Sequence, residues 1–222
     1  MLKQPPLLLV FDWDGTLVDS TRAIARAIQR AAADLHLEVP DDRRASHVIG
    51  LGLSDALRLA VPGLTRQRLP EYVERYRHHY LAAGTEPGAF EGIGEMLDEL
   101  QTFGVQLAVA TGKSRIGLER SLEQTGWRGR FVATRCADEG EPKPHPWMLN
   151  DLLEELELKP EQAMMIGDTT HDLQMAQAAG CPAIAVSYGA HPRETLETCA
   201  PLALVDHVPA LRSALLSCLR AA

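Results

Sequence analysis

The sequence predicts an α/β protein with a doubly wound parallel sheet and an inserted helical segment. Three observations lead to this prediction. Short apolar runs typical of buried strands recur along the chain, helical patterns separate most of them, and residues 17–85 carry helical patterns without a convincing strand. Alternating strands and helices indicate a parallel sheet covered on both faces. With 222 residues, the chain is long enough for such a core and a smaller appendage.

The first apolar run, residues 7–11, lies between Pro5-Pro6 and an acidic turn, as expected for a strand buried on both faces. Further runs end in small or acidic residues. They are residues 105–110, 163–166, 183–186 and 202–205, with a weaker candidate at 131–134. Ligands of parallel sheets bind beyond the carboxyl ends of the strands. The residues that follow these runs are therefore candidates for a functional site.

Helical patterns lie between the later strands. Residues 93–103 and the segment Leu149–Leu156 each place apolar side chains on one face, and Pro160 ends the second of these helices. Residues 173–179 form a short helix that Gly180 closes.

The insertion carries helix after helix. We expect helices at residues 20–35, 54–61 and 66–82, and Gly84 with the Pro87-Gly88 pair marks the return to the α/β pattern. We therefore assign residues 1–16 and 86–222 to the core domain, and residues 17–85 to a helical cap domain.

The composition narrows the classes of function. A formal charge of −8 argues against a nucleic-acid binder, and a protein with this charge needs a local cation or metal to attract an anionic substrate. The four cysteines contain no C-x-x-C pair, which favours free thiols in a reducing compartment. No stretch approaches the ~18 apolar residues that cross a bilayer. We expect a soluble, cytoplasmic protein without a membrane partner.

The segment after the first predicted strand reads Phe11-Asp12-Trp13-Asp14-Gly15-Thr16. In extended chain, positions i and i+2 point the same way, so the Asp12 and Asp14 carboxylates face one site. Two carboxylates so close are unfavourable unless a cation or a shared proton relieves their repulsion. An acidic turn needs only Asp14-Gly15, whereas D-x-D-G-T arises by chance in roughly one in a few hundred chains of this length.

Residues after the later strands extend this pattern. Thr111 follows the second strand, Lys143 lies between two prolines, and Asp168 and Asp172 lie in a G-D-x-x-x-D segment. In this order, they and the D-x-D-G-T segment resemble the four motifs of the haloacid dehalogenase (HAD) superfamily, in its phosphatase branch. The resemblance spans residues 7 to about 190 and implies a Rossmann-like core.

The resemblance implies a chemistry that fits the residue types. The charge of a phosphomonoester repels nucleophiles, so the site must neutralise charge and align the reacting groups. Mg²⁺ prefers carboxylate and water oxygens and would be held by Asp12, the backbone carbonyl of Asp14 and Asp168. Asp12 would attack phosphorus and form an aspartyl-phosphate. Asp14 would protonate the leaving alkoxide and then serve as base for the hydrolytic water.

The other motif residues have supporting roles by the same resemblance. Thr111 and the Gly112 amide would donate hydrogen bonds to a phosphoryl oxygen, and Lys143 would supply a positive charge to the phosphate and to Asp12. Asp172 would orient metal waters or Lys143. Taken alone, Thr-Gly is most often a turn, a lysine is most often solvated, and Asp172 could simply cap a helix.

Four more residues near the motifs have ordinary explanations. His145 and His171 lack partners that would make them catalytic. Asp19 fits a family pattern, and fits equally an N-terminal helix cap with Ser20. Trp13 either contacts substrate or packs.

By resemblance, residues 17–85 form the small helical cap of the phosphoglycolate phosphatase subfamily, which closes over the site and selects the substrate. Residues 46–53 look like its specificity loop, where Gly50, Leu51 and Gly52 would approach the ligand. Four further cap residues are candidates for a substrate carboxylate or second phosphate. They are Arg43, Arg44, His47 and Arg58.

These features predict a Mg²⁺-dependent phosphatase for a small-molecule, phosphoglycolate-like phosphomonoester. A sugar-phosphate, nucleotide or broad-specificity phosphatase remains open. A phosphomutase is less favoured, because the loop lacks the Gly-x-Ser-Arg stretch of β-phosphoglucomutases. A phosphonate hydrolase is disfavoured, because residues 17–85 contain no lysine for a Schiff base. A non-catalytic protein on this scaffold is the remaining alternative. The oligomeric state is not predicted.

Overall fold

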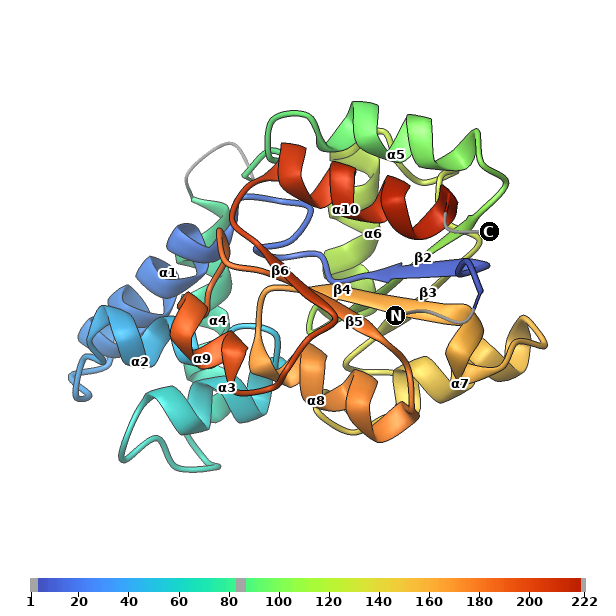
Figure 1. The fold of residues 1–222 in the computed structure, drawn as a ribbon. Helices are drawn as coiled ribbons and strands as arrows, with labels where there is room; N and C mark the ends of the chain where they lie inside the picture. The colour runs from blue at the N-terminus through green and yellow to red at the C-terminus, as the bar shows by residue number, and fades with distance from the viewer. Residues whose placement is uncertain (1–3, 83–86, 221–222) are drawn as a thin grey trace.

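A computed structural model describes residues 4–82 and 87–220. Within these residues, six parallel strands form one sheet in the order β3-β2-β1-β4-β5-β6 (Figure 1). The strands are β1 (Leu8–Phe11), β2 (Gln106–Thr111), β3 (Ala133–Cys136), β4 (Ala163–Gly167), β5 (Ala183–Val186) and β6 (Ala203–Val205). The predicted fold class and every predicted strand are confirmed. Gly84 and the assigned 85/86 domain boundary lie outside the described residues.

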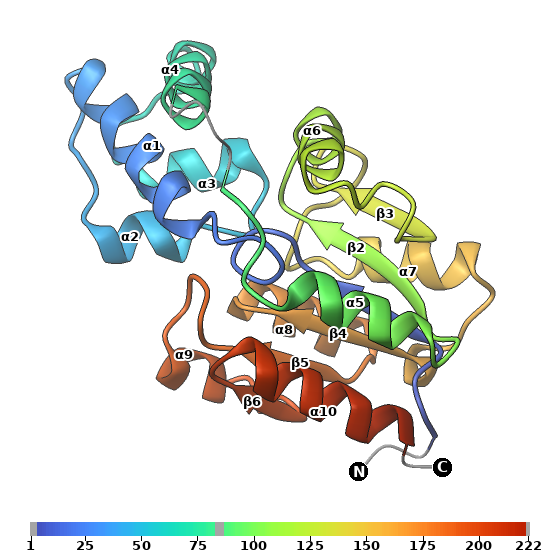
Figure 2. The same ribbon diagram turned by 90° about the horizontal axis from the view of Figure 1, so that it is seen from above.

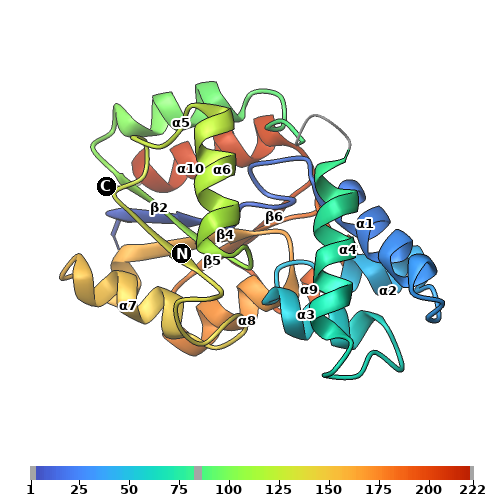
Figure 3. The same ribbon diagram turned by 180° about the vertical axis from the view of Figure 1, so that it is seen from behind.

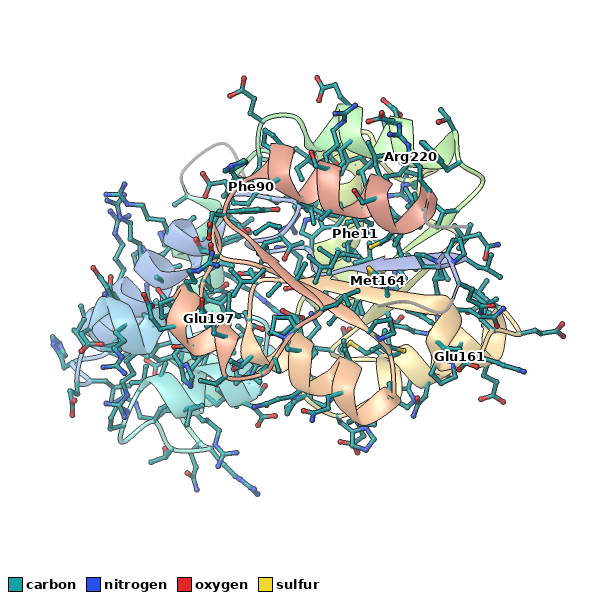
Figure 4. The ribbon with its side chains drawn as sticks, in the orientation of Figure 1. Phe11, Phe90, Glu161, Met164, Glu197 and Arg220 are labelled. Atoms are coloured by element: carbon teal, nitrogen blue, oxygen red, sulfur yellow. The ribbon has the colours of Figure 1, made fainter. Side chains whose placement is uncertain are left out.

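Helices cover both faces of the sheet, because alternate side chains of each buried strand point to opposite sides. Leu9 and Phe11 of β1 face α5 (Ile93–Gln101), α6 (Arg115–Thr125) and α10 (Val208–Arg220). In Figure 4, Phe11 and Met164 lie in the interior beneath α10. Leu8 and Val10 face α7 (Trp147–Glu155), α8 (Thr170–Ala179) and α9 (Arg193–Glu197) on the other side.

The helices α6, α9 and α10 were not predicted from the sequence. In α6 the buried side chains are few, and Ile116 is 75% exposed, so its apolar stripe is thin. Its signals lie at its ends instead. The Ser114 side chain accepts a hydrogen bond from the Gly117 amide, and Gly126 closes the helix in the left-handed conformation.

Helices α1 (Thr21–Asp34), α2 (Asp42–His47), α3 (Leu53–Ala60) and α4 (Leu69–Leu81) form a separate cluster beside the carboxyl ends of the strands (Figures 2 and 3). This cluster, the cap, has its own apolar core. The Tyr72 hydroxyl donates a hydrogen bond to the Ile28 carbonyl at 2.5 Å and ties α4 to α1. Helix α2 was missed, and it shortens the predicted loop at 46–53 to the residues between His47 and Leu53.

Histidines join the cap to the core. The Nε2 atoms of His171 and His191 each lie 3.0 Å from the backbone carbonyl of His47. The Nδ1 atom of His191 accepts a hydrogen bond from the Thr170 amide, so its ring proton sits on Nε2 and points to that carbonyl. Burial lowers the pKa of His191 to about 4, which keeps the ring neutral. His171 thus has a structural role, as expected, whereas His191 was overlooked.

Trp13 packs in the core. Its side chain is fully buried, donates a hydrogen bond from Nε1 to Ser121 Oγ at 2.8 Å, and meets Trp127 and Phe131 edge-on. The packing interpretation of Trp13 is therefore the correct one.

The four cysteines are free. Over residues 4–82 and 87–220, none of the helices combines the length and apolar character needed to span a bilayer.

Replacing Ser121 with Ala should destabilise the fold without changing the chemistry. The Trp13 N–H would remain buried without an acceptor, at a cost of about 1–3 kcal/mol in the free energy of unfolding. Urea denaturation measures this loss, with the exposed Ser213→Ala variant as control. An unchanged unfolding midpoint for Ser121→Ala would show that this hydrogen bond contributes nothing.

Candidate active site

The candidate site lies where the carboxyl ends of β1, β2 and β4 meet. Strand β1 pairs with β2 on one side and with β4 on the other, and the order of strands reverses around it. Open α/β sheets bind ligands at such a reversal. The pairing places Asp12, Thr111 and Asp168 at adjacent strand ends, and the Asp12 amide donates to the Ile166 carbonyl at 2.9 Å.

Lys143 links two of the predicted aspartates. Its ammonium lies 2.8 Å from Asp12 Oδ1 and 2.6 Å from Asp172 Oδ1, and all three side chains are almost completely buried. Burial alone would lower the pKa of Lys143, but attraction to the two carboxylates outweighs it and raises that pKa. Lys143 is therefore a fixed positive charge.

Asp172 contacts Lys143 and also caps a helix. Its Oδ1 receives the Lys143 ammonium, while its Oδ2 accepts hydrogen bonds from the amide and the hydroxyl of Thr169 and so closes a capping box at the start of α8. Because both oxygens have strong donors, Asp172 is arranged to hold Lys143 in place.

Asp168 is held in a tight cradle. Its Oδ1 accepts from the Thr16 hydroxyl at 2.8 Å, and its Oδ2 accepts from the Ala190 amide at 2.7 Å. A Cβ atom on Gly15 would lie 2.1 Å from Asp168 Oδ2, and the φ of Gly15 is +84°. Only glycine fits there, which explains the glycine of the D-x-D-G-T segment.

The buried charges do not balance. Asp12, Asp168 and Asp172 could place ligand atoms within 4.8 Å of one another, and Lys143 is the cation that contacts two of them. Burial raises the pKa of Asp12 to about 7, partly offset by Lys143 and reinforced by Asp172. Burial and the neighbouring carboxylates Asp12 and Asp172 also raise the pKa of Asp168 well above its usual value.

A metal ion fits this site. Among the described residues, Asp12 Oδ2 is buried without a hydrogen-bond partner, beside the cradled Asp168. An unpaired buried carboxylate oxygen in a cluster of excess negative charge is what a hard divalent cation would satisfy. The geometry therefore supports a metal held by Asp12 and Asp168.

Asp14 has two partners that the sequence did not reveal. The Ser20 hydroxyl donates to Asp14 Oδ1 at 2.6 Å, and the Lys113 ammonium lies 3.0 Å from the same oxygen. Ser20 occupies the N-cap position of α1 without capping it, and Asp19 is exposed, so the helix-cap interpretation was wrong. Lys113 could have been found, because it lies two residues beyond the end of β2.

A cavity of about 230 Å³ opens from Asp12 and Asp14 between core and cap. Gly50 and Leu51 line it, whereas Gly52 lies outside the lining and packs near Pro142. The backbone of this loop is so close that a Cβ atom on Gly112 would lie 2.6 Å from the carbonyl oxygens of Gly50 and Leu51. The cap is therefore in contact with the loop after β2.

The cations of the cavity differ from those proposed for the cap. Arg43, Arg44, His47 and Arg58 are exposed and lie outside its lining. The lining cations are Arg77, Lys113 and Arg120.

Of the other predicted residues, Thr111 is fully buried, and its hydroxyl accepts a hydrogen bond from the Lys113 amide at 3.2 Å.

Comparison with known proteins agrees with this geometry. Residues 9–186 match the haloacid dehalogenase-like hydrolase family. A probable phosphatase, IndB, from Dickeya dadantii is 37% identical over 205 residues, covering 90% of this chain and 89% of its own. A phosphoglycolate phosphatase from Aliivibrio fischeri is 32% identical over 208 residues, covering 90% and 92%.

Two further comparisons concern extent and shape. The tyrosine-protein kinase PtkA of Mycobacterium tuberculosis is 34% identical over 188 residues, and the chain spans only 64% of that protein's length. A crystal structure of a predicted phosphoglycolate phosphatase from Haemophilus somnus has a TM-score of 0.83 at 25% identity, covering 96% of this chain and 97% of the other.

Replacing Lys143 with Met should destabilise the metal-free protein by about 3–5 kcal/mol at pH 8, because buried carboxylates lose their cation. A raised carboxyl pKa means that the folded state binds the proton more tightly than the unfolded state, so stability falls as pH rises from about 4 to 7. Without Lys143, the pKa of Asp12 rises further, so the pH range over which stability falls extends to higher pH. The cost should therefore shrink at pH 5.5, where Asp12 is protonated.

Urea denaturation in the presence of a chelator, at pH 5.5 and pH 8, measures both costs. The exposed Lys159→Met variant is the control, and it should change stability by less than about 0.5 kcal/mol. An equal loss at both pH values for Lys143→Met would contradict this electrostatic account.

Proposed function

This chain belongs to the haloacid dehalogenase-like hydrolases, and we propose that it is a phosphatase that hydrolyses a small phosphomonoester with Mg²⁺, through an aspartyl-phosphate on Asp12. One observation carries the proposal. Asp12 is buried and held by Lys143, has a carboxylate oxygen without a hydrogen-bond partner among the described residues, and lines the cavity between core and cap.

Asp12, Asp168 and the backbone carbonyl of Asp14 would hold the ion. When bound, Mg²⁺ supplies the positive charge that lets a phosphate dianion approach a carboxylate. Lys143 adds a second positive charge and fixes the orientation of Asp12, since its other contact is Asp172. The Thr111 hydroxyl and the Gly112 amide, beside the end of β1, are the donors for the phosphoryl oxygens.

The reaction then has two steps. In the first, an Asp12 oxygen attacks phosphorus, the bond from phosphorus to the leaving oxygen breaks, and Asp14 gives its proton to the alkoxide. In the second, water attacks phosphorus, Asp14 takes a proton from that water, and the bond from phosphorus to Asp12 breaks. Inorganic phosphate leaves and Asp12 is restored. Ser20 and Lys113 hold the Asp14 carboxyl group for both steps.

Resemblance to the subfamily, taken alone, points to a phosphoglycolate-like phosphomonoester. A sugar phosphate or a nucleotide is the alternative. Each of these esters would place its phosphate at Asp12, and they differ in the leaving group that the cap would contact.

Replacing Asp12 with Asn should lower kcat for p-nitrophenyl phosphate by at least about a thousandfold, because the amide is not a nucleophile. The exposed Asp19→Asn variant, with the same chemical change in the same segment, should keep wild-type activity. Full turnover in Asp12→Asn, or wild-type turnover that a chelator leaves unchanged, would overturn the mechanism.

Mg²⁺ should bind more tightly at higher pH. The pKa of Asp12 in the metal-free protein is about 7, so a cation competes with a proton at pH 6 and hardly at all at pH 8. The apparent Kd should therefore fall by at least roughly tenfold between these pH values. Titration calorimetry with the free protein measures it, and an affinity that does not depend on pH would contradict the assignment of Asp12 as a ligand.

A further inference from the structure

The cavity above Asp12 and Asp14 has an unusual wall for an enzyme that binds small, highly charged metabolites. On the cap side, the wall is aliphatic. It is formed by Ile24 and Ile28 of α1 and by Val48, Ile49 and Leu51 of the loop that follows α2. A carboxylate or a hydroxyl group placed against these side chains would lose water without gaining a hydrogen bond, which is unfavourable.

Among the cations that line the cavity, the one that contacts Asp14 is already engaged. Lys113 pairs with Asp14 at 3.0 Å, and its ammonium lies 3.4 Å from the Tyr80 hydroxyl and over the Tyr80 ring. A substrate carboxylate at Lys113 would come close to the Asp14 carboxylate, and like charges at that distance repel. The other lining cations, Arg77 and Arg120, are on exposed parts of α4 and α6. The short glycolate group therefore has a poor match beside the phosphate.

Flat and apolar surfaces continue around the cavity. Tyr76 and Tyr80 of α4 lie in a near-parallel stack, with ring centroids 6.0 Å apart and planes 15° apart. Leu81 and Ile116 also line the cavity, and they are 41% and 75% exposed. Single exposed apolar side chains are normal on a protein surface. Here, both belong to the same cavity as the aliphatic wall.

The cavity has space for a small ring beside the reacting groups. A cavity of about 150 Å³ with aliphatic walls accepts a benzene ring. The 230 Å³ cavity therefore has space for one six-membered ring together with a phosphate group close to it.

We infer that this chain selects phosphomonoesters whose leaving group carries a single apolar, planar ring next to the phosphate, as in an arylmethyl phosphate. The ring would lie between the aliphatic wall and the tyrosines of α4, and the phosphate would lie at Asp12. This inference rests on the proposed phosphatase function and names the substrate class of the same site.

Three primary alkyl phosphates test the inference, because the leaving oxygen is similar in each. They are benzyl phosphate, ethyl phosphate and 2-phosphoglycolate. We expect kcat/KM for benzyl phosphate to exceed the other two by at least about tenfold, since burial of a ring-sized apolar group stabilises the complex by that much or more. A kcat/KM for 2-phosphoglycolate equal to or above that for benzyl phosphate would overturn the inference and leave the phosphatase function intact.

A fourth substrate tests whether the ring must lie directly next to the phosphate. In uridine 5′-monophosphate a ribose separates the base from the phosphate, so a hydroxylated sugar rather than an apolar ring would lie next to the phosphate. We expect it to be at least about tenfold poorer than benzyl phosphate. The reverse order would overturn the proposal of a compact arylmethyl ester. Absence of hydrolysis for every ester, p-nitrophenyl phosphate included, would instead contradict the proposed function itself.

Two variants on the lining localise the ring. Leu53→Asn and Ile116→Asn place a polar group of similar size on half-buried or exposed positions of the lining, so folding should be retained. Each should lower the ratio of kcat/KM for benzyl to ethyl phosphate by about threefold or more. Leu59→Asn, on the same helix as Leu53 and outside the lining, is the matched control and should leave the ratio unchanged. An unchanged ratio in both lining variants would overturn the inference.

Discussion

The ammonium group of Lys143 is the interaction on which the site depends. It is buried between Asp12 and Asp172, and it balances part of a cluster that would otherwise be purely anionic. Removing charges from water is expensive unless each has a well-placed partner. Thr169 holds Asp172, Thr16 and the Ala190 amide hold Asp168, and the sheet register brings these groups to the end of β1. The fold therefore holds buried carboxylates in an ordered arrangement whose charge a divalent cation would balance.

The cap contacts the core close to the candidate active site. Gly112 allows the backbone of Gly50 and Leu51 to approach the loop after β2, and the carbonyl of His47 receives hydrogen bonds from His171 and His191 of the core. Lys113 contacts Asp14 of the core and Tyr80 of the cap. The position of the cap is thereby coupled to the environment of Asp14. In the proposed mechanism, the reacting groups lie at the strand ends, and the cap side chains select the leaving group.

The sequence predicted the strands and the motif residues because both depend on local patterns: continuous apolar runs, and acidic or small residues directly after them. It did not reveal partners that meet only in three dimensions, such as Ser20 and Lys113 on Asp14, or His191 on the His47 carbonyl. Helix α2 was missed because its signal is the capping side chain of Asp41 rather than an apolar stripe. The candidate cap arginines lie outside the lining of the cavity, and the sequence does not show which face of a helix meets the cavity.

The identity of the group that becomes phosphorylated is the most direct test of this account. The wild-type protein with Mg²⁺ would be quenched during turnover of benzyl phosphate or p-nitrophenyl phosphate and reduced with borohydride, which converts an acyl phosphate to an alcohol. Peptide mass spectrometry then locates the modified residue. The account predicts reduction at Asp12 and at no other carboxylate. A modified Asp14, or a phosphoryl group recovered on a serine, threonine or histidine, would contradict it.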